Sequence, residues 1–469
     1  CRFASSTALH GRRSEAMTSK ALTTIILAAG KGTRMKSRLP KVLHPIAGRP
    51  MLGHVLAAAG ALEGGETVLV VGPGMEAVSD YAHTLLPAAK IAIQEQQLGT
   101  GDAVRSASAH VIHDDGVVLV TFGDAPLVRR ETLVGMVERC RDESDIVILG
   151  FEAADPTGYG RIVTDGDKVL RIVEHKDASE QERAIRLCFG GPMAVRAGHL
   201  SSLLAKLTSN NAQGEFYLTD FVAHGRAAGL DCSALICPES DIQGVNSRAD
   251  LAAAEASMQS RLRADAMTGG VTFLDPDTVY LSFDTSFGED VTVGQNVVFA
   301  PGCRIASGAT IKAFSHLEGA EVGEGAEIGP FARIRPGSSI GRKAKVGNFV
   351  ETKKAKIEDG AKISHLSYIG DARVGAGANI GAGTITCNYD GYNKFFTDIG
   401  AGAFVGSNSS LVAPVKIGDG AYLGSGSVVT KDVGAAALAV ARGKQIEKPG
   451  WAAAFRAKNE GIKKASSGD

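Results

Sequence analysis

The 469-residue sequence has few of the features that hold a small or secreted fold together. Its seven cysteines are scattered, odd in number and without a C-x-x-C pair, which argues for reduced thiols in a cytoplasmic protein rather than a disulfide framework or zinc site. No run approaches about 18 apolar residues, so no membrane-spanning helix is expected. Lysine and arginine (50) nearly balance aspartate and glutamate (51), which argues against nucleic acid as a partner.

Proline is scarce, whereas glycine is abundant. There are 15 prolines and 58 glycines, and 31 of those glycines fall in the last 200 residues. The glycine content is about 12%, against about 7% in an average protein. Because no G-x-y triplet register persists, a collagen helix is excluded. The glycines of the second part must therefore serve another regular geometry.

The length predicts two or three domains, preceded by a short extension. Residues 1–16 carry arginines but no apolar signal-peptide core, and the chain begins with Cys1. We interpret 1–16 as a non-native or disordered extension before a start at Met17, with a transit peptide as the alternative.

Short apolar runs alternate with helical patterns from residue 17 to 246. This alternation predicts a Rossmann-like α/β domain with a mostly parallel sheet. The expected strands are 23–28, 67–71, 90–93, 117–122 and 146–150, and the expected helices are 50–62, 75–86, 101–110 and 131–142. Residues 247–268, rich in alanine, leucine and arginine, predict a linker helix that ends at Gly269-Gly270.

Residues 269–469 contain apolar side chains that recur every six positions. A period of six is typical of the hexapeptide β-helix, in which three repeats make one triangular coil. We therefore expect a left-handed parallel β-helix followed by a tail. The clearest repeats are Val293, Phe299, Ile305, Ile311 and Leu317; Val322, Ile328, Ile334, Ile340 and Val346; and Ile399, Val405, Leu411, Ile417, Leu423 and Val429.

A glycine-rich turn follows the first strand, in the segment LAAGKGTRM (27–35). Its spacing fits neither a Walker loop nor the Rossmann fingerprint, but small residues at a strand-to-helix turn let backbone N–H groups approach phosphates. Arg34 and Lys41 would add positive charge there, and Asp124 ends a strand where a metal could bind.

Further motifs follow in order: QLGTG (97–101), GYGRIV (158–163), VEHKD (173–177) and GVN (244–246). With these, the chain resembles the sugar-1-phosphate nucleotidyltransferases. With the β-helix as well, residues 20–455 resemble the bacterial bifunctional UDP-N-acetylglucosamine pyrophosphorylase / glucosamine-1-phosphate N-acetyltransferase family.

The resemblance implies uridylyl transfer from UTP to N-acetylglucosamine-1-phosphate, with release of pyrophosphate and no protein nucleophile. Arg34 and Lys41 would neutralise phosphates, Asp124 and Asn246 would bind Mg²⁺, and Gly160 and Glu174 would face the sugar. The remaining nucleotide contacts implied by the resemblance are Leu27, Ala28, Gly30, Gln94, Gly99 and Thr100.

One segment departs from the family. Phe189 stands where these enzymes have an asparagine that contacts the amino sugar, and Pro192 removes a backbone donor. A phenylalanine cannot make those hydrogen bonds, so weaker uridylyl transfer or an altered sugar range is one alternative. The pair Gly190-Gly191 beside it has no evident role in the sequence.

A second set of polar residues interrupts the hexapeptides, in FARIRPG (331–337), NFVETKKA (348–355), ISHLSYIGD (363–371) and NIGAGTITCNYDG (379–391). The resemblance implies acetyl transfer from acetyl-CoA to glucosamine-1-phosphate, with His365 as general base. The implied sugar-phosphate residues are Arg335, Lys353, Tyr368, Asn379 and Lys394. The implied acetyl-CoA residues are Asn388, Tyr389, Ser407, Ser425 and Arg442.

The expected protein is thus a cytoplasmic homotrimer that makes UDP-N-acetylglucosamine for cell-wall precursors. A third alternative is a non-catalytic assembly subunit that pairs a similar nucleotidyltransferase domain with a β-helix. Such a subunit has no need of the complete acetyl-transfer set from Arg335 to Lys394, which argues against it.

Overall fold

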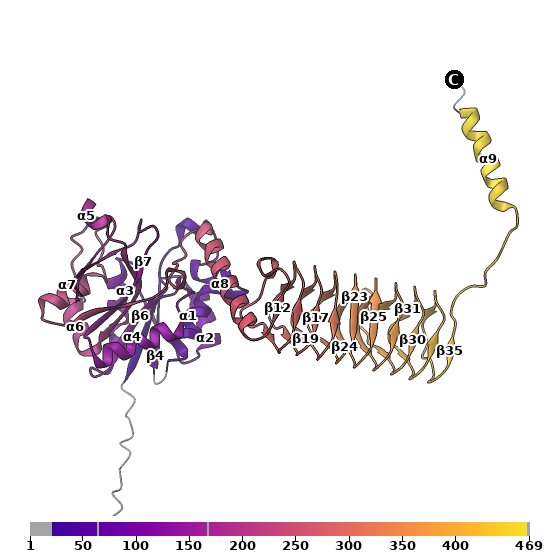
Figure 1. Ribbon diagram of the computed structural model, residues 1–469, viewed down its shortest axis with the longest axis horizontal. Helices are drawn as coiled ribbons and strands as arrows, with labels where there is room; N and C mark the ends of the chain where they lie inside the picture. Colours follow the sequence, from indigo (N-terminus) through magenta and orange to yellow (C-terminus); the bar gives the residue numbers. More distant parts are fainter. Residues whose placement is uncertain (1–20, 63–64, 167, 467–469) are drawn as a thin grey trace, which may run out of the picture. The chain divides into compact units, whose positions relative to one another are not determined.

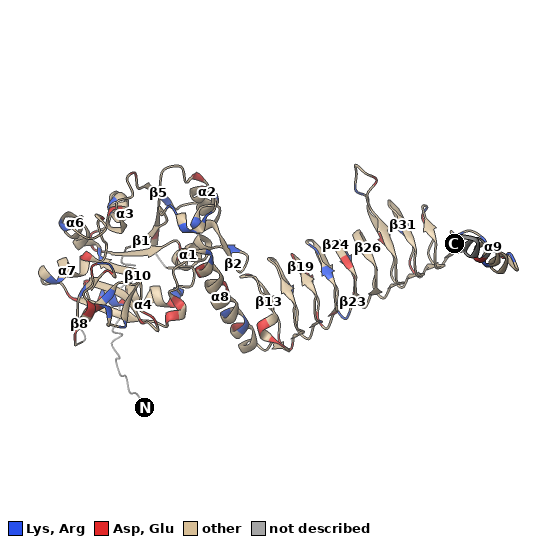
Figure 2. Ribbon diagram, turned by 90° about the horizontal axis from the view of Figure 1, so that it is seen from above, with Lys and Arg blue, Asp and Glu red and all other residues tan. Residues whose placement is uncertain are grey.

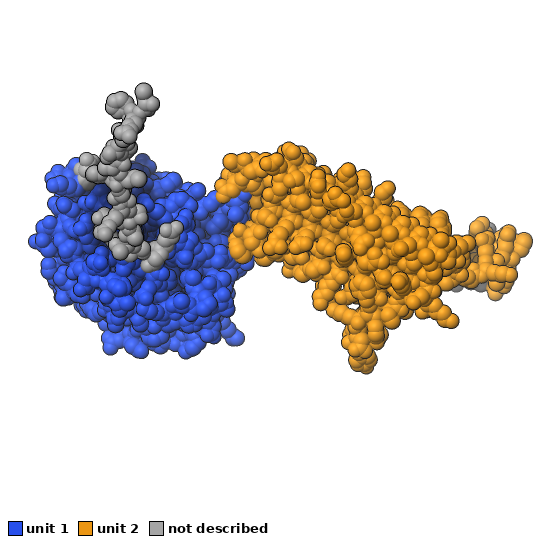
Figure 3. Space-filling view, turned by 90° about the horizontal axis from the view of Figure 1, so that it is seen from below, with its two compact units in different colours: residues 1–262 blue, residues 263–469 orange. Residues whose placement is uncertain are grey.

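A computed structural model describes residues 21–62, 65–166 and 168–466, so the predicted 1–16 extension lies outside the described residues. The chain forms two compact units, residues 1–262 and 263–469 (Figure 3). Each unit is described by itself below. Within the described ranges, no helix is both long and apolar enough to cross a membrane.

The first unit is built on one mostly parallel sheet, as predicted, with the order β11-β7-β10-β6-β1-β4-β5 (Figure 1). Parallel pairs join β1 to β4 and β6, β4 to β5, and β7 to β11, while β10 runs antiparallel between β6 and β7. The strands of this path are β1 (Leu22–Leu27), β4 (Gly65–Val71), β5 (Lys90–Ile93), β6 (Val117–Phe122), β7 (Ile146–Glu152), β10 (Leu187–Arg196) and β11 (Cys232–Ile236).

Alternate side chains of the central strands pack on opposite faces of this sheet, because successive side chains in a strand point to opposite sides. Ile25 and Leu27 join the helices α3 (Thr100–Ala107), α6 (Ala197–Lys206) and α7 (Asp220–Ala227) in one core. Ile26 joins α1 (Met51–Gly60) and α2 (Glu76–Leu85) in another. Helix α4 (Arg130–Asp142) covers the part of that second face near β7.

Helix α8 (Arg248–Thr268) occupies the segment predicted as a linker helix, and the boundary between the two units falls inside it. Its first part is anchored in unit 1, where Ala254 and Met258 pack against Ile46, Leu127 and neighbouring apolar residues. Gly270, with φ +94°, follows the last turn in the left-handed conformation that glycine tolerates best.

The second unit is a parallel β-helix in which most coils take 17 or 18 residues and the coil with the large loop takes 25. Strands from β12 (Thr272–Phe273) to β35 (Leu438–Ala439) stack in parallel, for example Val293 on Ile311 and Ile311 on Ile328 (Figure 1). Every apolar residue of the predicted repeats named above is less than 5% exposed, so the six-residue prediction is confirmed in full.

The central coils carry longer strands and the one large loop. The strands are β23 (Lys345–Asn348), β24 (Glu351–Ile357), β25 (Lys362–His365), β26 (Tyr368–Val374), β27 (Asn379–Ile380) and β28 (Ile385–Cys387). After β28 the chain leaves the coil and returns at β29 (Thr397–Ile399), and Figure 2 shows this loop standing out from the stack. Tyr389 and Lys394 pair across it.

The cysteines behave as the composition predicts. The six that the structure describes are free, and four of them are buried. Burial raises the pKa of the Cys140 and Cys232 thiols to about 12, so both stay protonated and unreactive near neutral pH.

Candidate functional sites

A cavity of about 470 Å³ lies at the carboxyl ends of β1 and β6 in the first unit. In open parallel sheets this edge is where ligands bind, because backbone groups and loops converge there. The cavity collects eight of the residues predicted for the nucleotide site: Leu27, Ala28, Gly30, Lys41, Gln94, Gly99, Thr100 and Asp124.

The glycine-rich turn lines part of this cavity. Gly32 has φ +59°, and a Cβ atom there would come within 2.6 Å of the Lys41 Cβ, so only glycine lets Lys41 approach the turn. Arg34 lies in a short 3-10 turn (Thr33–Met35), is exposed and does not line the cavity. Its predicted role at the phosphates therefore stays a prediction.

Three predicted residues from distant parts of the chain meet at one point. The Lys41 ammonium forms an ion pair with the Asp124 carboxylate and donates a hydrogen bond to Asn246 Oδ1 at 3.1 Å. The Lys41 side chain is 11% exposed and that of Asp124 is 20% exposed, so water screens this pair weakly. The convergence gives a cation, a carboxylate and an amide oxygen within one hydrogen-bonded cluster.

The oxygen atoms of Asp124 and Asn246 are the kind of donor that Mg²⁺ takes. Mg²⁺ in nucleotide enzymes is held by one or two protein oxygens, with phosphate oxygens and waters completing the shell. The described residues contain no cluster of three or more His, Cys, Asp and Glu side chains, which fits such a sparse site better than a closed protein cage. The residues present therefore fit the ion.

The QLGTG turn shapes the opposite wall of the cavity. Gln94 Nε2 donates to the Gly99 carbonyl at 2.9 Å, and Gly99 has φ +108°. Gln97, which was not singled out from the sequence, donates to the Ala29 carbonyl at 2.7 Å and so ties this turn to the glycine-rich one. Glu215, also missed, lines the cavity. Gln97 lies in the QLGTG motif, but its contact with Ala29 joins residues 68 positions apart and does not follow from the motif.

Gly160 and Glu174 lie together but outside the cavity lining. A Cβ atom on Gly160 would lie 3.7 Å from both Glu174 carboxylate oxygens, so the two are direct neighbours. The Thr219 hydroxyl donates to Glu174 Oε1 at 3.1 Å. Burial raises the pKa of Glu174, and the Thr219 hydrogen bond partly offsets that rise.

The segment around Phe189, which departs from the family sequence, forms an irregular part of β10. The Phe189 side chain packs against the apolar core on one face of the sheet, while its backbone N–H donates to the Gly160 carbonyl at 2.8 Å. The strand register shifts between Phe189 and Met193, and Gly191 has φ +106°. The glycine pair thus belongs to a β-bulge, with Gly191 close to the Phe122 ring.

In the second unit, His365 has one close polar partner. Its Nδ1 lies 2.6 Å from Asn348 Oδ1, and the two residues are directly paired in β25 and β23. Because an amide oxygen only accepts, this contact puts the imidazole proton on Nδ1 and leaves the Nε2 lone pair free. His365 is exposed, so that lone pair is open to a substrate. Asn348 was not singled out from the sequence, although it lies in the NFVETKKA motif.

Three cationic side chains gather on the neighbouring coils. Lys394 on the loop faces Lys353 and lowers the pKa of the Lys353 ammonium, and Arg335 lowers it further. Arg335 donates to Glu351 Oε1 at 2.7 Å, which raises the pKa of its guanidinium. Tyr368 lies directly opposite Glu351 in the next coil. Like charges held this close favour a bound anion between them.

The residues predicted for acetyl-CoA form two groups. Asn388, at the start of the loop, donates to the Asp371 carboxylate in β26, whereas Tyr389 donates to the Gly391 carbonyl within the loop. Ser407 and Ser425 occupy matching places on successive coils, where Gly426 N–H donates to the Ser407 carbonyl and Arg442 donates to that of Ser425 at 2.6 Å. Asn379 lies at the start of β27, between Lys362 and Phe404.

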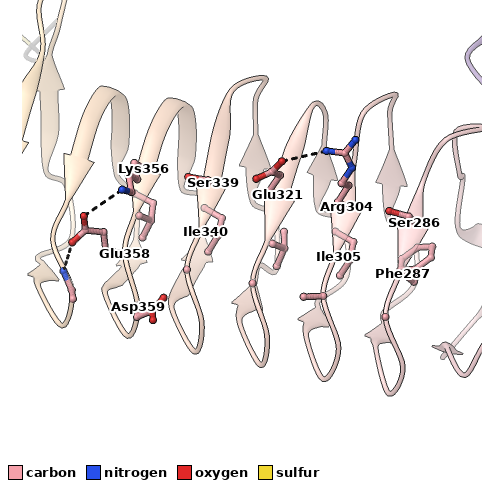
Figure 4. Close-up of a pocket in the computed structure, with 17 residues that line it drawn as sticks. Ser286, Phe287, Arg304, Ile305, Glu321, Ser339, Ile340, Lys356, Glu358 and Asp359 are labelled. Carbon is pink, nitrogen blue, oxygen red and sulfur yellow. Dashed lines mark hydrogen bonds and ion pairs between the residues drawn. The ribbon is translucent and has the colours of Figure 1, made fainter.

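A further cavity, of about 780 Å³, is an open groove along an outer face of the coil (Figure 4). It contains none of the predicted site residues. Its rim carries paired charges, such as Arg304 with Glu321 at 3.4 Å and Lys356 with Glu358 at 3.9 Å.

The fold and the two clusters define a nucleotidyltransferase joined to a hexapeptide-repeat transferase. Family models agree: a MobA-like NTP transferase domain matches residues 24–217, and six bacterial transferase hexapeptide repeats match residues 396–431.

Full-length relatives identify the family. The chain is 77% identical to the bifunctional protein GlmU of Parvibaculum lavamentivorans, over 96% of this chain and 100% of that one. It is 53% identical to the GlmU protein of Paramagnetospirillum magneticum (96% and 99%) and 55% identical to that of Sphingopyxis alaskensis (92% and 96%). The chain belongs to the bifunctional GlmU family.

Proposed function

We propose that each of the two clusters described above carries one activity of this bifunctional enzyme. The enzyme acetylates glucosamine-1-phosphate and transfers a uridylyl group from UTP to N-acetylglucosamine-1-phosphate. The product, UDP-N-acetylglucosamine, serves cell-wall biosynthesis. We assign uridylyl transfer to the first unit and acetyl transfer to the second. Because the first of these reactions consumes UTP and the second consumes acetyl-CoA, we place the enzyme in the cytoplasm.

The observation that best supports the acetyl-transfer assignment is that an exposed imidazole with a free Nε2 lone pair and a group of three cationic side chains lie on neighbouring coils. Arg335, Lys353 and Lys394 hold the sugar phosphate, and Tyr368 and Asn379 orient the sugar. His365 Nε2 takes a proton from the glucosamine nitrogen as that nitrogen attacks the thioester carbonyl, and the thiolate of CoA leaves. A backbone N–H near Ser425 stabilises the oxyanion that forms on the carbonyl.

Uridylyl transfer depends on positioning and charge. The turn from Leu27 to Gly30, with Gln94, Gly99 and Thr100, holds the nucleotide, and Lys41 neutralises phosphate charge beside the α-phosphorus. Gly160 and Glu174 face the sugar. Asp124 and Asn246 would hold a Mg²⁺ ion, which would neutralise the negative charge that develops on phosphate oxygens. The sugar phosphate oxygen then attacks in line and pyrophosphate leaves.

A paired assay tests the proposed function on one preparation. Acetyl-CoA-dependent release of CoA with glucosamine-1-phosphate measures the first reaction. Pyrophosphate release from UTP with N-acetylglucosamine-1-phosphate measures the second. Both are expected, and a protein that performs neither reaction would contradict the proposal.

We expect Phe189→Asn to lower the KM for N-acetylglucosamine-1-phosphate by about fivefold, because one regained hydrogen bond contributes about 1 kcal/mol. The KM for UTP should not change, since the nucleotide residues are untouched. Phe189→Leu, which keeps an apolar side chain, serves as the matched control. Equal sugar KM values for Phe189→Asn and the parent would show that this position does not contact the sugar.

We also propose that the enzyme is a homotrimer, with the acetyl-transfer site completed by a neighbouring β-helix. The support is that His365 and Lys394 are exposed, and that Phe314, Phe331 and Phe349 form a stacked, half-exposed apolar ridge on the same coils. Exposed apolar ridges of this kind favour protein contacts. Analytical ultracentrifugation should give three times the chain mass, whereas a monomer that acetylates at full rate would contradict the proposal.

A further inference from the structure

Arg161 is an unusual residue in the first unit. It is 1% exposed, and it has the largest side chain among the fully buried residues that the structure describes. Its hydrogen bonds go to two backbone carbonyls and a histidine rather than to a carboxylate, and the exposed Asp155 interacts with its charge only through space. Burying a cation without a carboxylate partner costs substantial free energy unless many hydrogen bonds compensate. Such a residue therefore needs a reason beyond general packing.

The compensation comes from three segments that surround the sugar-side residues. The guanidinium donates to the carbonyl of Tyr159, to the carbonyl of Arg183 from both Nε (3.4 Å) and Nη2 (3.3 Å), and to His175 Nδ1 at 3.3 Å. Tyr159 directly precedes Gly160, and His175 directly follows Glu174. One buried side chain thus joins the GYGRIV and VEHKD segments on either side of the two residues proposed to face the sugar.

The backbone around Arg161 reinforces this link. Arg161 begins β8 (Arg161–Asp165) and pairs with Val173, the last residue of β9 (Lys168–Val173). It also pairs with Cys188 in β10, immediately before Phe189. The backbone of Arg161 therefore lies where β8, β9 and β10 come together, next in sequence to Gly160 and paired beside Glu174 and Phe189.

The contact with His175 also fixes a tautomer. Arginine has only donors, so His175 Nδ1 must accept, and in the neutral ring the proton then lies on Nε2. Lysine could not reproduce this arrangement. Its three N–H donors are all on one nitrogen atom, whereas arginine has five N–H donors distributed over the three nitrogens of its planar guanidinium.

From this geometry we propose that Arg161 is a positioning residue for uridylyl transfer, which holds Gly160 and Glu174 at the spacing that the sugar phosphate requires. It acts through Tyr159 and His175 and does not touch the substrate. The inference rests on the proposed uridylyl transfer and deepens it, since it assigns a determinant of sugar binding that is separate from nucleotide binding.

The test is a comparison of KM values in the full-length enzyme. Arg161→Lys keeps the charge and loses the fork, and Arg161→Met loses both. In each variant the KM for N-acetylglucosamine-1-phosphate should rise about tenfold or more, while the KM for UTP stays within about twofold of the parent. Acetyl transfer by the same protein should be unchanged, which shows that the second unit is folded, and the unchanged KM for UTP shows that the first unit is folded.

The control is Arg196→Lys, because Arg196 also bonds backbone carbonyls, those of Cys140 and Arg141, at the opposite end of β10. It should alter neither KM. The inference is overturned if Arg161→Lys leaves the sugar KM unchanged, or raises both KM values equally, as a purely structural residue would. If Arg161→Met does not fold, Arg161→Lys alone decides. A parent enzyme that acetylates but releases no pyrophosphate would instead contradict the proposed function.

Discussion

His365→Ala is expected to reduce acetyl transfer by about 10²- to 10⁴-fold, the usual contribution of a positioned general base. The glucosamine amine must lose a proton to become an acyl amide, and His365 Nε2 is the free basic atom beside the cationic cradle. Uridylyl transfer should be unchanged, because the variant lies in the other unit. Steady-state rates of both half-reactions on one preparation measure the effect.

The contact between His365 and Asn348 refines this prediction. Asn348→Ala leaves the imidazole in place but removes the acceptor that holds its proton on Nδ1, so we expect a smaller loss of about tenfold. His316→Ala is the matched control, since His316 lies on an earlier coil, in β18 (His316–Leu317), outside the candidate site. If His365→Ala acetylates as fast as His316→Ala, another group is the base.

Asp124→Asn is expected to reduce uridylyl transfer by about 10²- to 10³-fold, and to leave acetyl transfer intact. The substitution keeps the shape of the side chain and removes the charge that pairs with Lys41 and suits Mg²⁺. The remaining activity should need a higher Mg²⁺ concentration, because a neutral amide is a weaker ligand than a carboxylate. Pyrophosphate release measured over a Mg²⁺ titration gives both values.

A control separates this effect from a general change of charge. Asp165→Asn removes one negative charge from an exposed position at the end of β8 and should leave both the rate and the Mg²⁺ requirement unchanged. An Asp124→Asn enzyme with the parent's rate and Mg²⁺ dependence would remove Asp124 from the metal site.

The regular parts of the fold are predictable from sequence because their periods are local. In the β-helix each sixth residue points inward, so residues such as Ile311, Ile328 and Leu411 are identified as buried from spacing alone. The Rossmann-like strands are found for a similar reason, as short apolar runs between helices. The position of β10 is different: it runs antiparallel between β6 and β7, which no local pattern reveals.

The sites are less predictable, because their contacts join distant parts of the chain. Lys41 reaches partners 83 and 205 residues away, and only the folded sheet brings them together. Asn348 and His365 are 17 residues apart, which is one coil in which one of the three repeats has five residues instead of six. Their pairing therefore depends on where that shorter repeat falls. Arg161 lies in the GYGRIV motif, but its proposed role does not follow from the motif, because its hydrogen bonds reach His175 and Arg183, 14 and 22 residues away.

The central claim is that one chain carries two independent sites that act in sequence. The most direct measurement is UDP-N-acetylglucosamine formation from glucosamine-1-phosphate, acetyl-CoA and UTP by His365→Ala, by Asp124→Asn and by a mixture of the two variants. We predict almost no product from either variant alone, and restored product from the mixture, as the acetylated sugar phosphate passes from one protein to the other. Full product formation by either variant alone, or none by the mixture, would contradict the account.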